Sequence, residues 1–238
     1  MFLPPHFSSV LVCSYLFLST LANVLQSNFM EQGFKQRNIT YLALGDSYTI
    51  GESVEKTDAF PWQTVQILKK DGWIAEDPVV IAKTGWTTGE LQAAINEAGI
   101  TREFDFVSLL IGVNNQYRGY SLSAYETEFA KLLNQAIGFA GKQPNHVFVF
   151  SIPDWGQTPF AAGKDREKIA REIDAFNAAN RKIATAAGVH YIDITAETRK
   201  VGEDPALVAN DFLHPSKKAY GQWAQKLATA VNEIFEKQ

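Results

Sequence analysis

The chain has 238 residues, of which 46% are hydrophobic, and its formal net charge is −4. A chain of this size and composition can bury a substantial core, so one α/β domain of roughly 200 residues is expected. The acidic balance, with a pI near 5.6 and no stripe rich in Lys and Arg, argues against a protein that binds nucleic acid through its phosphates, and the single cysteine, Cys13, excludes a disulfide framework or a multi-cysteine metal site.

The first 29 residues have two interpretations. Residues 10–22 form an apolar run that resembles the core of a secretory signal peptide and is short for a transmembrane helix. No Lys or Arg precedes this run, however, and Met30 begins an ordinary hydrophilic lead-in to the first predicted strand. The protein is expected to be periplasmic or secreted if the leader is real, and cytoplasmic if translation starts at Met30. In either case the mature domain, over residues 38–238, is expected to contain no stable membrane span.

Past this segment, apolar runs of strand length alternate with longer amphipathic stretches. This alternation is typical of repeated βα units, in which helices cover both faces of a parallel sheet. Strands are predicted over residues 40–44, 78–82, 106–111, 146–151 and 189–193. Helices are predicted over residues 59–70, 91–98, 123–140 and 164–187, and from residue 215 onwards. Ser123 and Glu126 form a capping-box pattern at the start of the third helix, and Pro215 suits the first turn of the last.

A serine lies directly after the first predicted strand. The strand ends at Gly45, and Asp46 and Ser47 come next in a turn rich in Gly and Thr. Open α/β folds place their chemistry in such turns, at the carboxyl ends of parallel strands, where the free N–H groups of the next helix point outward. Ser47 is therefore a candidate nucleophile. Taken alone, however, an Asp-Ser pair at such a position is more often a helix cap.

Three other strand ends carry residues that are suited to chemistry. Gly85 follows the second predicted strand, Asn114 follows the third, and Asp211 and His214 follow the fifth. Because the carboxyl ends of parallel strands lie along one edge of a sheet, these residues can meet Ser47 in space. This convergence favours chemistry over capping at Ser47.

These four blocks, in this order, resemble those of the GDSL (SGNH) hydrolase family, from about residue 40 to the C-terminus. The resemblance implies a three-layer α/β/α fold with a five-stranded parallel sheet of flavodoxin-like topology. It implies that Ser47 is the nucleophile, that His214 is the general base and that Asp211 orients the imidazolium. It also implies an oxyanion hole made by the backbone N–H groups of Ser47 and Gly85 and the side-chain amide of Asn114. These roles are physically reasonable, because a serine hydroxyl is a poor nucleophile at neutral pH without a base beside it.

The chain departs from the family's pattern at two positions. Tyr48 stands where the family name has leucine, a position that varies within the family. Asn115 stands where the third block usually has an aspartate, which is expected to support the loop rather than to react. An amide of similar shape can hydrogen-bond in its place, so this departure concerns only the electrostatics of the loop.

Other chemistries lack their signatures in this sequence. Zinc-ligand spacings, a P-loop and a dinucleotide-binding glycine pattern are all missing, and the sequence implies no metal and no cofactor. His146 and His190 fall within predicted strands, where histidines are more often structural than ligands.

The expected reaction is hydrolysis of carboxylic esters through an acyl-enzyme on Ser47. The expected substrates are small soluble esters, such as acetylated sugars or short-chain acyl esters, because no extended apolar lid segment is apparent. Aromatic rings near the strand ends can wall a pocket or serve as loop anchors, and an arginine there can meet a carboxylate or phosphate. The candidate substrate-binding residues are Trp86, Tyr117, Arg118, Trp155 and Phe160.

Two alternative functions remain open. A thioesterase or lysophospholipase would use the same catalytic residues, and a non-catalytic ligand-binding module could have the same fold. The oligomeric state also stays open.

Overall fold

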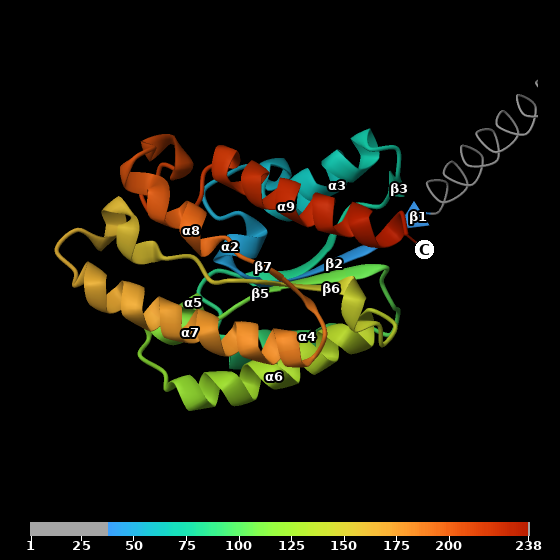
Figure 1. The fold of residues 1–238 in the computed structure, drawn as a ribbon, viewed down its shortest axis with the longest axis horizontal. Helices are drawn as coiled ribbons and strands as arrows, with labels where there is room; N and C mark the ends of the chain where they lie inside the picture. The colour runs from blue at the N-terminus through green and yellow to red at the C-terminus, as the bar shows by residue number, and fades with distance from the viewer. Residues whose placement is uncertain (1–37, 238) are drawn as a thin grey trace, which may run out of the picture.

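The computed structural model describes residues 38–237, and its centre is a five-stranded parallel sheet (Figure 1). The strands are β2 (Tyr41–Asp46), β4 (Val79–Lys83), β5 (Phe106–Leu110), β6 (Val147–Phe150) and β7 (His190–Ile192). Their order across the sheet is β4-β2-β5-β6-β7, and each neighbouring pair is parallel. Numbered along the chain, this order is 2-1-3-4-5, which is the expected flavodoxin-like order. The predicted leader over residues 1–29 and the alternative start at Met30 lie outside the described residues.

Helices cover both faces of this sheet, as Figure 1 shows. On one face lie α3 (Phe60–Lys70) and α9 (Lys217–Phe235), which pack against each other. On the other face lie α4 (Thr88–Ala98), α6 (Leu122–Phe139) and α7 (Arg166–Ala186). The three inner strands, β2, β5 and β6, are buried along their whole length, as parallel strands covered on both faces should be. The predicted three-layer α/β/α fold is therefore confirmed.

Short elements follow the carboxyl ends of the strands. α2 (Ser47–Ile50) follows β2, α5 (Val113–Tyr117) follows β5, and α8 (Thr195–Thr198) follows β7. The 3₁₀ helices are η1 (Lys56–Asp58), η2 (Pro144–His146), η3 (Trp155–Gln157), η4 (Pro159–Ala161), η5 (Arg199–Gly202) and η6 (Pro205–Leu207). His146 thus ends a 3₁₀ helix and does not belong to a strand. The sequence does not predict β1 (Asn38–Ile39) and β3 (Ile74–Ala75), which form a separate two-stranded parallel sheet.

Aromatic rings in the core join α9 to the start of α2. Trp223 of α9 is fully buried, and its ring centroid lies 6.4 Å from that of Tyr48 and 6.3 Å from that of Phe60. The Tyr48 ring also contacts the His214 ring, with 5.0 Å between the centroids. Aromatic pairs at such distances contribute about 0.5–1.5 kcal/mol beyond the burial of their area. This packing fixes α2 and the segment around His214 against α9.

The third predicted helix begins earlier than its capping-box pattern indicates. α6 starts at Leu122, because Ser121 has extended backbone angles and its hydroxyl accepts the Ala124 N–H. The predicted cap at Ser123 is therefore wrong by two residues. A neighbouring serine supplies the side-chain acceptor that a helix N-terminus needs.

The last helix begins later than predicted. α9 starts at Lys217, and the hydroxyl of Ser216 accepts the Ala219 N–H as its cap. Pro215 lies outside the helix, in an isolated antiparallel bridge with Val208. Proline therefore lies in the bridge that precedes the helix and does not open the helix.

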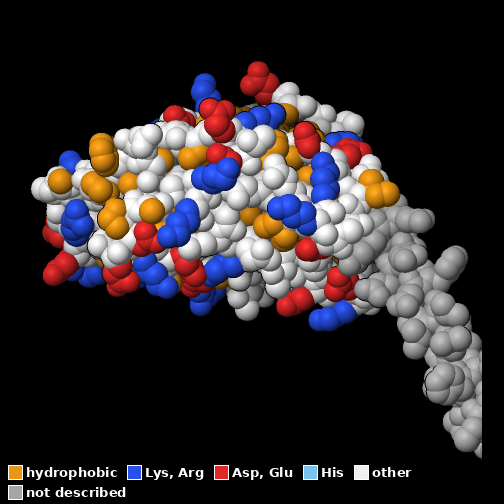
Figure 2. Space-filling model, turned by 90° about the horizontal axis from the view of Figure 1, so that it is seen from above, with side chains coloured by type: hydrophobic (Ala, Val, Ile, Leu, Met, Phe, Trp, Pro, Cys, Tyr) orange, Lys and Arg blue, Asp and Glu red, His pale blue; other side chains and the backbone are white. Residues whose placement is uncertain are grey.

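The side of the molecule formed by α3 and α9 carries charges of both signs. Figure 2, which views this side, shows Lys and Arg side chains interspersed with Asp and Glu. Hydrophobic side chains gather toward its left end, where Figure 1 places the loops that follow the strands. None of the helices within residues 38–237 is both long enough and apolar enough to cross a membrane.

Gly45 lies where β2, β5 and α2 meet with no room for a side chain. A Cβ atom at this position would lie 2.5 Å from the carbonyl oxygen of Leu110 in β5, and closer still to the hydroxyl of Thr49 in α2. A larger residue would have to move backbone as well as side-chain atoms. Because glycine has no Cβ atom, β2 can continue directly into α2 without a clash with Leu110 of β5.

We expect Gly45→Ala to lower the free energy of unfolding by about 1–3 kcal/mol, the usual cost of forcing atoms into a packed interior. Gly138→Ala is the matched control, because Gly138 lies on α6 with no heavy atom within 4 Å of an added Cβ. There the higher helix propensity of alanine should leave stability unchanged or raise it by up to about 1 kcal/mol. Urea unfolding followed by circular dichroism measures both changes, and equal stabilities of the two variants would contradict the crowding at Gly45.

Candidate active site

Ser47 opens α2 immediately after the last residue of β2. Asp46 caps this helix, since its Oδ1 accepts the Tyr48 N–H at 3.0 Å. The helix ends after one turn at Gly51, which has a left-handed φ of 79° and donates its N–H to the Ser47 carbonyl oxygen. The strand, the cap and the single turn thus fix Ser47 at the carboxyl edge of the sheet, where its side chain is largely buried.

Asp211 and His214 reach Ser47 although 167 positions separate Ser47 from His214. The His214 Nε2 atom lies 3.0 Å from the Ser47 Oγ, and the Nδ1 atom lies 2.6 Å from the Asp211 Oδ2. Because an ionised carboxylate only accepts hydrogen bonds, Nδ1 donates to Asp211, and Nε2 of the neutral ring is left to accept the Ser47 proton. The three residues expected to carry the chemistry are therefore in hydrogen-bonding contact.

The Asp211 carboxylate accepts hydrogen bonds from three further donors. Its Oδ1 accepts the N–H groups of Leu213 and His214, each at 3.0 Å, and its Oδ2 accepts the hydroxyl of Ser53 at 2.7 Å. Partial burial of the carboxylate raises its pKa. The hydrogen bonds from these three donors and from the His214 ring have the larger effect, and they lower the pKa of Asp211 to about 2. Asp211 is therefore ionised throughout the neutral pH range.

The sequence does not single out Ser53. This residue lies in the turn after α2 with a φ of 66°, a left-handed conformation that is uncommon for residues other than glycine. Phe212, beside Asp211, has a similar φ of 63°. Serine is common in turns for many reasons, and no motif distinguishes a serine that reaches a distant carboxylate. Only the structure brings the Ser53 hydroxyl and Asp211 together.

Gly85 and Asn114, the expected oxyanion donors, flank the segment that carries Ser47, because β4 and β5 are the two neighbours of β2. Asn114 is the second residue of α5, and its Nδ2 lies 3.0 Å from the Trp86 carbonyl oxygen and 3.4 Å from the Asp46 Oδ2. Gly85 has a φ of 82°, and its N–H has no hydrogen-bond partner within residues 38–237. Gly85 and Asn114 thus follow the two strands that pair with β2, one on each side of the strand that ends before Ser47.

Asn115 holds the start of α4 against α5. Its side chain is buried, its Oδ1 accepts the Thr88 N–H at 3.1 Å, and its Nδ2 donates to the Thr88 hydroxyl at 2.7 Å. That hydroxyl donates its own proton to Glu128. An aspartate at position 115 could not donate to the Thr88 hydroxyl, so the amide suits the hydrogen bonds of this chain.

An open pocket of about 170 Å³ lies over the Ser47 and His214 side chains. Three of the five expected substrate-binding residues line it, namely Tyr117, Trp155 and Phe160. The Trp155 ring centroid lies 5.2 Å from that of Tyr117 and 6.1 Å from that of Phe160, and the two outer rings are about half exposed. The remaining lining residues are Tyr48, Val113, Asn114 and Leu213. Within the described part of the chain, no three His, Cys, Asp or Glu side chains gather in a group that could hold a metal ion.

Trp86 and Arg118, the other two expected substrate-binding residues, do not line this pocket. The Arg118 guanidinium donates to the Gly85 carbonyl oxygen and forms an ion pair of 3.3 Å with Glu90. The half-buried Trp86 ring packs against the hydrophobic core. The Arg118 guanidinium thus binds to other residues of this chain, at the turn that carries Gly85, and is not part of the pocket lining.

Asp46 places a second carboxyl group beside the nucleophile, and the sequence gives it no role beyond a helix cap. It is only 1% exposed. Burial raises its pKa to about 7, although hydrogen bonds from the Tyr48 N–H, its own N–H and the Asn114 side chain act in the opposite direction. This carboxyl group therefore changes its charge in the neutral pH range.

The sequence matches a known family over most of its length. The model of the GDSL-like lipase/acylhydrolase family matches residues 43–222. Among curated proteins, no sequence matches the chain significantly.

Solved structures with the same fold have low sequence identity to this chain. The acetylxylan esterase Axe2 from Geobacillus stearothermophilus is 20% identical, with a TM-score of 0.64 over 83% of this chain and 95% of that chain. The lipase Lip_vut3 from a goat rumen metagenome is 21% identical, with a TM-score of 0.66 over 81% and 97%. The psychrotrophic esterase EstA from Pseudoalteromonas sp. is 16% identical, with a TM-score of 0.63 over 82% and 97%. At these identities the likeness shows the fold alone.

We expect Asp46 to make the free energy of unfolding fall as the pH rises from about 4 to about 7. Above its ordinary pKa of 3.8 the unfolded chain releases the Asp46 proton, whereas the folded chain keeps it until about pH 7. Folding binds a proton in this window, so stability present at low pH is lost as the pH rises through the folded pKa. Asp46→Asn removes the titrating group but keeps an oxygen that can accept the Tyr48 N–H.

Urea unfolding of both proteins from about pH 3.5 to about pH 8.5 measures this effect. The difference between them isolates Asp46, because every other titrating group is common to both. The stability of Asp46→Asn relative to wild type should rise up to about pH 7 and then level off. Two curves that run parallel over the whole range would show that Asp46 titrates alike in the folded and unfolded chains.

Proposed function

This chain belongs to the GDSL-like lipase/acylhydrolase family and is a hydrolase of ester bonds, and we propose that it cleaves small soluble carboxylic esters through an acyl-enzyme on Ser47. The observation that carries this proposal is the unbroken contact from Ser47 through His214 to Asp211, with distances of 3.0 and 2.6 Å. A base at hydrogen-bonding distance from a hydroxyl can take its proton, and a carboxylate behind the base stabilises the charge that results.

In the proposed reaction, Ser47 Oγ attacks the ester carbonyl carbon while His214 Nε2 takes the hydroxyl proton. Asp211, which is ionised at neutral pH, stabilises the imidazolium through Nδ1. The tetrahedral intermediate collapses when His214 gives this proton to the leaving alcohol, and an acyl ester of Ser47 remains. Water then attacks this ester with His214 again as the base, and the carboxylic acid and free Ser47 are released.

We assign the negative oxygen of the tetrahedral intermediate to the Ser47 N–H, the Gly85 N–H and the Asn114 amide. The first N–H groups of a helix have no intrahelical partner, and α2 begins at Ser47. The Asn114 Nδ2 carries two protons, so it can keep its bond to the Trp86 carbonyl oxygen and exchange its long bond of 3.4 Å to Asp46 Oδ2 for one to the substrate. Three donors preorganised in this way stabilise a charge that appears only in the transition state.

The pocket supports a small substrate with an apolar or sugar-like leaving group. Its volume of about 170 Å³ and its aromatic lining by Tyr117, Trp155 and Phe160 suit a compact ester, since aromatic faces stack on sugar rings and on short apolar chains alike. One protein with this fold is an acetylxylan esterase, so the fold accommodates acetylated sugars. In this proposal Arg118 acts by holding the Gly85 turn through the Gly85 carbonyl oxygen.

Ser47→Ala should lower kcat for p-nitrophenyl acetate by at least about 10³-fold, because the acyl-enzyme cannot form. Ser123→Ala is the matched control, since Ser123 is exposed on α6 and lies outside the pocket. A serine-reactive fluorophosphonate followed by peptide mass spectrometry should label Ser47 in wild type and in the control. Retained turnover or labelling in a folded Ser47→Ala protein would remove Ser47 from the mechanism.

Asn114→Ala should lower kcat by roughly 10²- to 10³-fold with a smaller change in KM, because an oxyanion donor acts mainly in the transition state. Asn96→Ala, a change on the exposed face of α4, serves as the control and should retain wild-type rates. Steady-state kinetics with p-nitrophenyl acetate measure both variants. A loss of only a few-fold in Asn114→Ala would make Asn114 a turn residue and not an oxyanion donor.

A further inference from the structure

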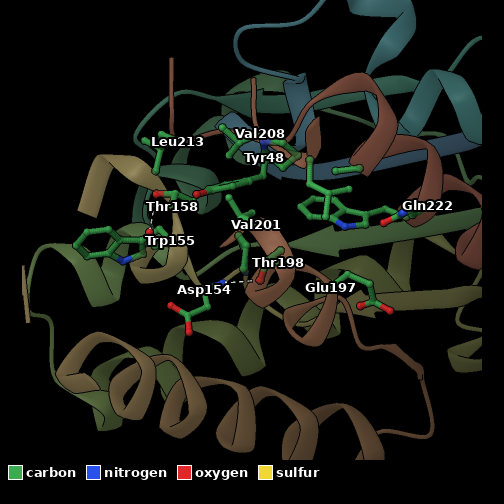
Figure 3. Close-up of a pocket in the computed structure, with 15 residues that line it drawn as sticks. Tyr48, Asp154, Trp155, Thr158, Glu197, Thr198, Val201, Val208, Leu213 and Gln222 are labelled. Atoms are coloured by element: carbon green, nitrogen blue, oxygen red, sulfur yellow. Dashed lines mark hydrogen bonds between the residues drawn. The ribbon is translucent and has the colours of Figure 1, made fainter. Parts of the chain in front are cut away.

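A second cavity, narrow and almost entirely apolar, lies behind the catalytic pocket (Figure 3). Its volume is about 20 Å³, which is room for about one water molecule or one methyl group. Figure 3 shows Leu213 and Trp155 toward one side of this cavity and Glu197 and Gln222 toward the other. Its walls come from α2, from the loop after β6, from residues 197–208, from the two neighbours of His214 and from α9.

Three residues, Tyr48, Trp155 and Leu213, line both this cavity and the catalytic pocket and so form the wall between them. Two of the three are held firmly. Tyr48 is buried and stacks on Trp223, and the Trp155 indole N–H donates to the Gln116 side chain at 2.8 Å. The Leu213 side chain is half-buried and apolar, so packing alone holds it in place. Leu213 is therefore the part of the wall that a substitution can remove without breaking a hydrogen bond.

The two halves of an ester substrate have different needs in the proposed reaction. The alcohol leaves after the first step, so its path leads to solvent past the exposed rings of Tyr117 and Phe160. The acyl group stays on Ser47 until water attacks, so it can occupy the inner part of the pocket. Leu213 bounds that inner part, and the space beyond it has the apolar lining that a hydrocarbon chain favours.

We propose that Leu213 limits the length of the acyl group by closing the catalytic pocket off from the apolar cavity. This inference rests on the proposed ester hydrolysis, because an acyl group is present only in that reaction. With leucine at position 213 the pocket holds short acyl groups. A smaller residue joins the two spaces and lets a longer chain extend toward Val201 and Trp223, which line the cavity. Each methylene buried there contributes about 0.8 kcal/mol, or about fourfold in kcat/KM.

The test compares wild type, Leu213→Ala and Leu213→Val in the hydrolysis of p-nitrophenyl acetate, butyrate and hexanoate. The readout is the ratio of kcat/KM for hexanoate to kcat/KM for acetate. This ratio should exceed the wild-type ratio by at least about tenfold in Leu213→Ala, with Leu213→Val between them. Val208→Ala is the matched control, because Val208 lines the same cavity but not the catalytic pocket. Its ratio should stay within about twofold of wild type.

Unchanged ratios in the folded Leu213 variants would overturn the proposal. An equal rise in Val208→Ala would also overturn it, because the size of the cavity and not its wall would then set the chain length. Should Leu213→Ala fail to fold by circular dichroism, the milder Leu213→Val change decides the question. Wild-type protein that hydrolyses none of these esters would refute the proposed function itself, and the inference would fall with it.

Discussion

The Asp211 carboxylate joins two distant parts of the chain at the site, and the geometry of the site depends on it. It accepts N–H groups from its own segment, including the His214 ring, and the hydroxyl of Ser53 from the turn after α2, 158 positions away. Hydrogen bonds to an ionised acceptor are roughly twice as strong as neutral ones. The turn that follows Ser47 and the segment that carries His214 are thereby fixed relative to each other before any substrate binds. This preorganisation is the condition under which an imidazole and a hydroxyl act as a pair.

The strands and the meeting of the candidate residues could be predicted because they follow from short-range patterns and one rule of topology, whereas the order of the strands was implied by the resemblance to the GDSL family. Apolar runs identify parallel strands buried on both faces, and the carboxyl ends of such strands share an edge. Ser47 and His214 could therefore be brought together from the sequence alone. The pairing of β1 with β3 could not be predicted, because a strand of two residues is too short to show a hydrophobic pattern.

The rest of the site depends on contacts between segments that are far apart in the chain. Trp86 and Trp155 are both aromatic residues in loops after strands, yet only Trp155 lines the catalytic pocket. The direction of its ring follows from the hydrogen bond to Gln116, which no local pattern reveals. The raised pKa of Asp46 likewise arises from burial by the surrounding elements and not from its neighbours in the sequence. The cavity behind Leu213 is assembled by five segments of the chain, so no single stretch of residues predicts it.

The separation of 167 positions between Ser47 and His214 has a consequence for the chain as it is made. Proteins are synthesised from the N-terminus, so a ribosome-bound chain that has emerged only as far as β7 contains every strand of the main sheet and the serine, but lacks the imidazole and its carboxylate. At that stage Ser47 is an ordinary alcohol. In the proposed mechanism, reactivity therefore arises only when the segment before α9 has left the ribosome and docked beside Ser47.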